Sequence, residues 1–201
     1  DGVVVNMSKS GTPDAVTLET SADGVTWTTF DGDGGTTPIT LTNAGDRVYF
    51  RAGTGGNTRF GNMLGGYIYS HKFTLSGQCA AHGNIMSILN GSDETNTTIQ
   101  SEYCFYNLFQ GCVNLTNAPD LPATTLSAYC YGSMFSGCTS LSVAPQITAT
   151  TLAERCCQQM FNGCTAMTAS PDLPATTLAD GCYSGMFSGC TNLNYIKAVT
   201  R

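Results

Sequence analysis

Eight of the ten cysteines in this 201-residue chain recur at a fixed interval of 26 residues. They form two series that run eight residues apart. The series are Cys104, Cys130, Cys156 and Cys182, and Cys112, Cys138, Cys164 and Cys190. The residues between them align at the same interval, without a gap, from Cys104 to Leu193. A repeat with a period of roughly 20–50 residues indicates stacked units, each of which buries its apolar side against its neighbours.

Each repeat carries an apolar pair, then a glycine and a cysteine, and then a strand-like segment interrupted by proline. The pairs are Leu108-Phe109, Met134-Phe135, Met160-Phe161 and Met186-Phe187. We expect these pairs to fill an interior opposite the strands. The glycine two residues later suits a left-handed helix cap. A period of 26 falls within the range of leucine-rich repeats, in which a strand is followed by a helical or 3₁₀ return.

The motif M-F-x-G-C-x-x-L, followed by A-P-x-L-P-A-T-T-L, resembles the BspA-like leucine-rich repeats of bacterial surface proteins. The commoner form of that family has A-F-x-x-C-x-x-L in shorter repeats. The lead-in GNIMSILN at 83–90 is similar to the segment that opens such arrays in Bacteroides-type gut bacteria. The resemblance covers about residues 77–196. It implies a secreted or surface-anchored solenoid used in adhesion or binding, and it supplies no catalytic residues.

Before about residue 75 the repeat is absent, and short β-type runs alternate with turn residues. We predict strands at 3–5, 15–20, 25–30, 39–41, 47–52 and 67–75, with a flexible glycine-rich connection at 53–66. Segments 17–31 and 39–52 are similar to the β-rich domain that precedes such arrays in gut Bacteroidetes proteins.

The predicted fold therefore has two parts. Residues 1–75 form a small all-β sandwich, and residues 76–201 form a leucine-rich-repeat (α/β-type) solenoid with 26-residue turns. Within the solenoid, residues 76–100 are an opening or cap segment, and four Cys-x7-Cys turns begin at Cys104.

The cysteines are best interpreted as buried thiols that act as small apolar side chains. A helical return would place residues eight apart at about 12 Å, whereas a disulfide needs Cα atoms within about 7 Å. Disulfides within one turn remain the alternative if the chain folds back at the glycine. A metal site is the weakest interpretation, because no Cys-x2–4-Cys pair with a partner histidine occurs.

The two chain ends give expectations of their own. Asp1 is followed directly by strand-like sequence without a signal peptide, which indicates a processed or engineered fragment. After the fourth repeat the interior of the solenoid must be covered. Either a further domain or the final residues Tyr195–Val199 would do this.

The composition excludes several classes of function. A net charge of −6 with eight Lys and Arg residues argues against binding to nucleic acid or an anionic membrane. The sequence has no apolar window of about 18 residues that could span a membrane. Two histidines, both outside the repeats, and scattered acids provide no catalytic set. We predict a protein that is not an enzyme and has no cofactor.

Two groups of residues resemble metal ligands, and neither fits a known site. His71, Cys79 and His82 match no standard ligand spacing. Asp31-Gly-Asp33 resembles the start of a calcium loop, but Thr42 stands where such a loop needs glutamate. A glycine-rich turn is the preferred interpretation, and we predict no metal.

The strand face of the repeats is the predicted partner-binding surface. Six residues occupy two outward positions on it: Asn117, Val143 and Ala169, and Asp120, Gln146 and Asp172. These positions could equally serve only solubility. We predict a non-catalytic, secreted or cell-surface adhesion protein of bacterial origin, whose partner is a host or bacterial surface protein or a glycan. The alternative is a carbohydrate-binding accessory module that uses the sandwich aromatics Trp27, Tyr67 and Tyr69.

Overall fold

The computed structural model of the protein describes residues 2–30, 38–91, 93 and 95–198, and the calcium-like segment at Asp31 and Asp33 lies outside them. The elements are β1 (Val3–Ser10), β2 (Leu18–Ser21), β3 (Thr28–Phe30), β4 (Ile39–Leu41), β5 (Tyr49–Ala52), β6 (Gly61–Leu64), β7 (Tyr67–Leu75), β8 (Cys79–Ala80), α1 (Ser87–Asn90), β9 (Leu115–Asn117), β10 (Ala169–Leu173) and β11 (Tyr195–Ala198). No helix within these ranges is long and apolar enough to cross a membrane.

The N-terminal part consists of two antiparallel sheets, with strand orders β4-β1-β7-β6 and β3-β2-β5. They meet through aromatic side chains, because Phe50 of β5 packs edge-on against Phe73 of β7 with ring centroids 5.2 Å apart. Strands occur in every predicted run of this part. The segment 53–66, expected to be a flexible connection, contains β6, which forms a hairpin with β7.

The predicted fold class, a small β-sandwich followed by an α/β-type leucine-rich-repeat solenoid, is wrong. Among the described residues the only helix is the four-residue α1, and the chain is all-β with separate sheets. The residues expected to form a helical return are a series of tight turns. We call these the turn segments. They comprise residues 103–112, 129–138, 155–164 and 181–190.

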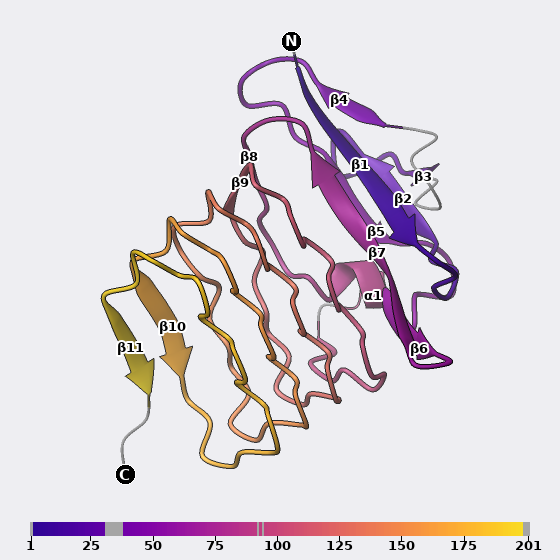
Figure 1. Ribbon diagram of the computed structural model, residues 1–201. Helices are drawn as coiled ribbons and strands as arrows, with labels where there is room; N and C mark the ends of the chain where they lie inside the picture. Colours follow the sequence, from indigo (N-terminus) through magenta and orange to yellow (C-terminus); the bar gives the residue numbers. More distant parts are fainter. Residues whose placement is uncertain (1, 31–37, 92, 94, 199–201) are drawn as a thin grey trace.

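Hydrogen bonding between repeats explains why the turn segments are not helical. Every second amide donates to the following repeat, as Phe105 does to the carbonyl of Cys130 (2.8 Å) and Phe109 to that of Met134 (2.9 Å). The intervening amides close turns within their own segment, as Leu108 does to Phe105 (3.2 Å). In an α-helix all these amides would donate four residues back along the chain. Half of them are used instead to join repeats side by side (Figure 1).

The interior of the repeats is a ladder of stacked aromatic rings. Phe109, Phe135, Phe161 and Phe187 stack nearly parallel, with successive centroids 5.5, 5.7 and 5.9 Å apart. The apolar pairs expected in the core are buried, except that Phe187 in the last repeat is only partly buried.

The cysteines are free thiols, and all except Cys79 are buried. This agrees with the interpretation of the repeat cysteines as small core residues. Those of the second series also donate S–H bonds to phenylalanine carbonyls. Cys138 donates to Phe109 (3.1 Å) and Cys164 to Phe135 (3.2 Å) of the preceding repeat, and Cys112 donates to Phe73 of β7 (3.1 Å). Burial raises the pKa of the Cys164 thiol to about 12, so the thiol keeps the proton that it donates.

Left-handed backbone conformations recur at every fourth residue of the turn segments. Gly137 has φ 76°, and its equivalents in the other repeats are similar. A Cβ atom on Gly137 would lie 3.6 Å from Gly111 in the repeat before, which is an ordinary contact distance. A larger residue at position 137 would therefore be disfavoured by the left-handed backbone conformation and not by a steric clash. The expectation of a left-handed glycine is confirmed, but the glycine closes a turn and caps no helix.

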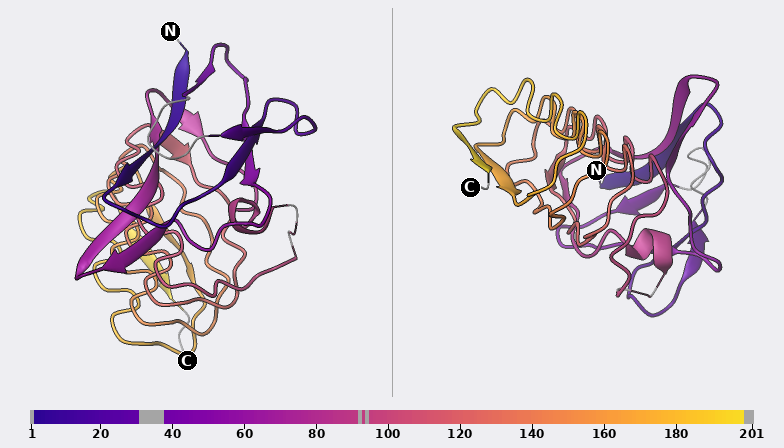
Figure 2. Two further views of the ribbon diagram at one scale, coloured as in Figure 1. Left: turned by 90° about the vertical axis from the view of Figure 1, so that its right-hand side faces the viewer. Right: turned by 90° about the horizontal axis from the view of Figure 1, so that it is seen from below.

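The N-terminal sheets cover the first repeat and extend its ladder. Phe73 of β7 stacks on Phe109 at 5.3 Å, and its amide donates to the Leu108 carbonyl (2.8 Å). Phe60 stacks on Phe105 in the same way, and its amide donates to the backbone carbonyl of Cys104. One core therefore runs from the sheets into the repeats. Figure 2 shows the sheets at one end of the stack and β11 at the other.

Truncation within the ladder tests how far the repeats depend on stacking. Phe135→Ala should lower the free energy of unfolding by about 3–5 kcal/mol, because a buried ring is lost between two others. Phe187→Ala should cost roughly half as much, because this ring stacks on one neighbour only. Urea unfolding measures both variants. An equal decrease in the free energy of unfolding of the two would contradict a ladder that ends at Phe187.

Candidate functional site

The predicted binding positions lie on the edge of the repeats that contains β9, β10 and β11. Asn117 forms a parallel bridge with Val143, and Ala169 pairs with Tyr195 of β11. Val143 is 63% exposed, whereas Asn117 and Ala169 are half-buried. The structure thus extends the first predicted row by Tyr195, which sequence reasoning had placed in a closing segment. The 26-residue step from Ala169 was the signal that could have found it.

The second predicted row is exposed but partly engaged in contacts between repeats. The side-chain carbonyl of Gln146 accepts the Asp172 amide (3.0 Å), and Lys197 of β11 contacts the Asp172 carboxylate (3.0 Å). This hydrogen bond with Asp172 raises the pKa of Lys197. Asp120 lies one repeat before Gln146, and its backbone bridges Asn84. We call the two rows, with Tyr195 and Lys197, the binding face.

The binding face combines an apolar line with a polar one. Val143 and Tyr195 are exposed apolar residues of the first row, and the acidic residues and Lys197 run beside them. Adjacent strands stand about 4.8 Å apart, so each row presents its side chains at a fixed spacing. Such an arrangement can bind an extended partner.

A cavity of about 1240 Å³ lies between the two N-terminal sheets and the first repeat. Phe50, Phe73 and Phe109 contribute apolar surface to it, and Trp27, the residue before β3, also lines it. The guanidinium of Arg51 lies 4.1 Å from the centroid of a Trp27 ring, and Arg51 is itself paired with Glu19 (2.7 Å). One face of the indole is therefore occupied by the protein.

The three residues of the predicted sugar platform do not come together. Tyr67 and Tyr69 belong to the β6–β7 hairpin and do not line the cavity beside Trp27. Tyr67 is exposed. The ring of Tyr69 covers Gly11, where an added Cβ would overlap it. Of the three, Trp27 is the one that lines the cavity of about 1240 Å³.

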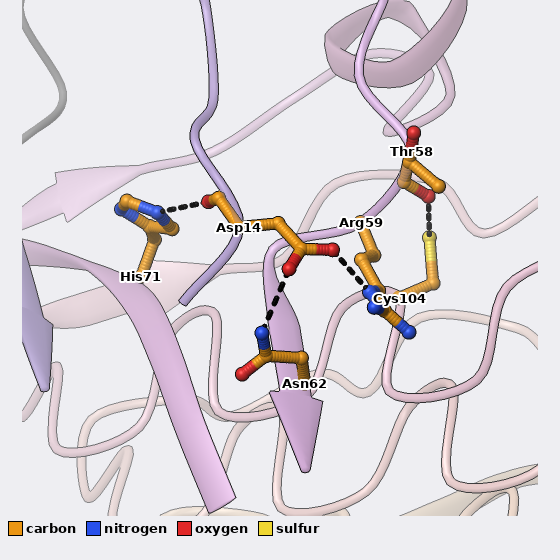
Figure 3. Close-up of polar contacts among 6 residues, drawn as sticks. All are labelled: Asp14, Thr58, Arg59, Asn62, His71 and Cys104. Atoms are coloured by element: carbon orange, nitrogen blue, oxygen red, sulfur yellow. Dashed lines mark hydrogen bonds and ion pairs between the residues drawn. The ribbon is translucent and has the colours of Figure 1, made fainter. Parts of the chain in front are cut away.

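A polar cluster around Asp14 ties the loop before β2 to the β6–β7 hairpin (Figure 3). Arg59 Nε donates to one Asp14 carboxylate oxygen (2.6 Å), and Asn62 Nδ2 donates to the other (2.8 Å). His71, fully buried, donates from Nε2 to the Asp14 backbone carbonyl (2.9 Å). The hydrogen bond from Arg59 is the main cause that lowers the pKa of Asp14.

This cluster lacks the geometry of a catalytic centre. His71 contacts the backbone of Asp14, not its carboxylate, and Nδ1 has no hydrogen-bond partner among the described residues. The Cys104 thiol is directed at the carbonyl of Thr58 (3.8 Å), and burial raises its pKa, so no activated nucleophile faces the imidazole. Throughout the described ranges no group of His, Cys, Asp or Glu is arranged to hold a metal ion. The cluster fastens the loop in place.

Comparisons with known proteins give no relative. No family model matches the chain, and neither the curated proteins nor the solved structures contain a match.

The Asp14 cluster predicts a specific pH dependence. Because its folded pKa lies below the ordinary 3.8, ionised Asp14 adds stability above that pH, and this is lost as the pH falls through the folded value. Asp14→Asn should therefore have a lower free energy of unfolding than the natural protein at about pH 6. Between about pH 6 and about pH 3, the free energy of unfolding should fall less in Asp14→Asn than in the natural protein. Urea unfolding at both pH values measures this, with Asp180→Asn as the control at an exposed carboxyl group. An equal fall of the free energy of unfolding in Asp14→Asn and in the natural protein between the two pH values would contradict this prediction.

Proposed function

We propose that the protein is a non-catalytic binding or adhesion protein that recognises a macromolecular partner through the binding face. The observation that carries the proposal is the exposure of Val143 on the side of the repeats where Asp120, Gln146 and Asp172 form a polar row. Exposed apolar surface rimmed by polar residues is typical of interaction sites. The BspA-like resemblance of the repeats supports the same function.

The proposed location is extracellular or on a bacterial cell surface, and the partner is a host or bacterial surface protein or a glycan. The face carries Asp120 and Asp172 with Lys197 at one end, so its charge is small and mixed. Affinity for such a partner would come from the apolar line and from hydrogen bonds, since exposed ion pairs contribute little. A repeated row also favours partners that are themselves extended or repetitive.

A charge placed on the binding face tests the proposal. Val143→Arg should weaken binding about tenfold or more, because the arginine would stand in the apolar line. The measurement is surface plasmon resonance against a panel of purified extracellular-matrix proteins, mucins and bacterial surface polysaccharides.

The matched control is Val113→Arg. Val113 is 48% exposed and precedes β9, outside the two rows, so this variant adds the same charge without changing a residue of the binding face. Equal loss of binding in both variants, or retention of binding in Val143→Arg, would show that the partner docks elsewhere.

The alternative function is carbohydrate binding in the cavity beside Trp27. The specific observation in its favour is that the indole lines a space of about 1240 Å³ with mixed polar and aromatic walls. Sugars stack on such rings, and one face of this indole is occupied by Arg51, so a sugar would stack on the opposite face.

A glycan array distinguishes the two functions. Under the alternative, Trp27→Ala should abolish sugar binding, because the stacking ring is lost, whereas Tyr67→Ala on the distant hairpin should leave it intact. Sugar binding that survives Trp27→Ala would exclude the cavity as the site.

A further inference from the structure

One end of the inner face of the four-stranded sheet forms an aliphatic wall of the cavity of about 1240 Å³. Val3 of β1 pairs with Leu41 of β4, and Val5 of β1 pairs with Leu75 of β7. Paired residues of this register share one face of a sheet, and all four line the cavity. Val5 is buried, whereas the other three are only half-buried. The apolar face of the sheet therefore continues into the cavity.

Two other parts of the chain add apolar walls to the same space. Val48 and Phe50 line the cavity from β5 and the residues before it, and Ala81 lines it just after β8. These three are also half-buried and pack against the edge of the core. The volume exceeds the roughly 300–1,000 Å³ of sites for drug-sized ligands. The cavity therefore has room for a long hydrocarbon chain.

The aliphatic wall selects the chemistry of a ligand that fills this part of the cavity. Hydroxyl groups placed against Val3, Leu41 and Leu75 would lose hydrogen bonds to water without replacing them, which is costly. Methylene groups placed there would gain free energy, because apolar surface leaves water on both sides of the contact. The wall therefore favours a hydrocarbon over a sugar.

A charged side chain at the cavity is free to contact a ligand. Asp46, Arg47 and Arg51 line the cavity. Arg51 is paired with Glu19 (2.7 Å), and the Asp46 carboxylate accepts two amides of its own turn (2.8 Å each). Arg47 is exposed, and it has no ion pair or side-chain hydrogen bond with any residue that the structure describes. Its guanidinium can therefore pair with a carboxylate.

We infer that the cavity binds a fatty-acid-like ligand, with the hydrocarbon chain against the aliphatic wall and the carboxylate at Arg47. The chain would cover the half-buried Val3, Leu41 and Leu75. The inference goes beyond the proposed function, because it uses the N-terminal cavity and not the binding face. It also differs from the carbohydrate alternative, which depends on the ring of Trp27.

Cys79 provides a probe of occupancy inside the cavity. It lines the cavity, and it is the one free thiol of the described residues that is not buried. N-ethylmaleimide should therefore alkylate Cys79 of the native protein well before the other cysteines. Octanoate, decanoate and dodecanoate are the ligands, each kept below the concentration at which it forms micelles. Mass spectrometry after digestion with pepsin measures the rate of alkylation.

Bound ligand should slow the alkylation of Cys79, with an affinity that depends on the length of the chain. Each buried methylene should raise the affinity roughly threefold to fourfold. Each pair of added methylenes should therefore raise it about tenfold.

A substitution that fills the cavity tests where the chain binds. Ala80→Trp should weaken dodecanoate binding about tenfold or more in isothermal titration calorimetry, because Ala80 lines the cavity and an indole would occupy the space. Ala15→Trp is the matched control, since Ala15 lies in the loop before β2 and does not line the cavity. Both alanines are exposed, so both variants should fold.

The head group is tested with methyl dodecanoate, which has the same chain without a carboxylate. Arg47→Ala should weaken dodecanoate binding about tenfold and leave binding of the ester unchanged. If the natural protein binds the ester as tightly as the acid, the ligand is the acyl chain of an esterified lipid and the carboxylate assignment is wrong.

Several other outcomes would overturn the inference. Unchanged alkylation of Cys79 at about 1 mM dodecanoate, roughly the weakest affinity expected of a specific site, is one of them. Protection that does not depend on chain length is another. Faster alkylation of the buried cysteines would show that the acid unfolds the protein, and it would overturn the inference too. So would equal weakening by Ala80→Trp and Ala15→Trp.

Discussion

Sideways hydrogen bonds from alternate amides of the turn segments hold the repeats together, and the other features of the stack depend on them. They place each repeat in register with the next, which brings the phenylalanine rings within stacking distance. The same register sets Cys138, Cys164 and Cys190 each beside a carbonyl of the preceding repeat, where the S–H can donate. The direction of these bonds gives the stack two unlike ends. One is an acceptor end, covered by the N-terminal sheets, and the other is a donor end at the fourth repeat.

Stacking in register also explains why only 11% of the chain is charged. A charge at one position of the repeat would recur about 4.8 Å away in the next, and like charges that close repel each other. The few charges present are placed against partners of a different kind. Lys197 contacts Asp172, and Arg155 lies over the ring of Tyr129 at 5.8 Å. Threonine and serine take most other outward positions, because they stack without repulsion.

Much of the local structure could be predicted from the sequence. Alternating β-type runs located the N-terminal strands, and the period identified core residues such as Phe135 and the left-handed Gly137. The helical return was wrong, because a ten-residue segment with an apolar pair and a glycine satisfies both a short helix and a series of turns. β6 was missed because its glycines and polar residues resemble a loop, and its pairing with β7 is what makes it a strand. Trp27, Tyr67 and Tyr69 do not line one cavity, because strand alternation does not tell which sheet a residue will join.

The sequence by itself determined the repeat, its register and the residues of its interior, because a 26-residue period fixes which side chains can stack. Only the tertiary structure decided where the backbone amides donate. That choice depends on a neighbouring repeat 25 residues away, which no local pattern encodes. It also decided the neighbours of each candidate site residue. Tyr195 joined Ala169, and Trp27 was separated from Tyr67, because these contacts form only when strands distant in sequence pair.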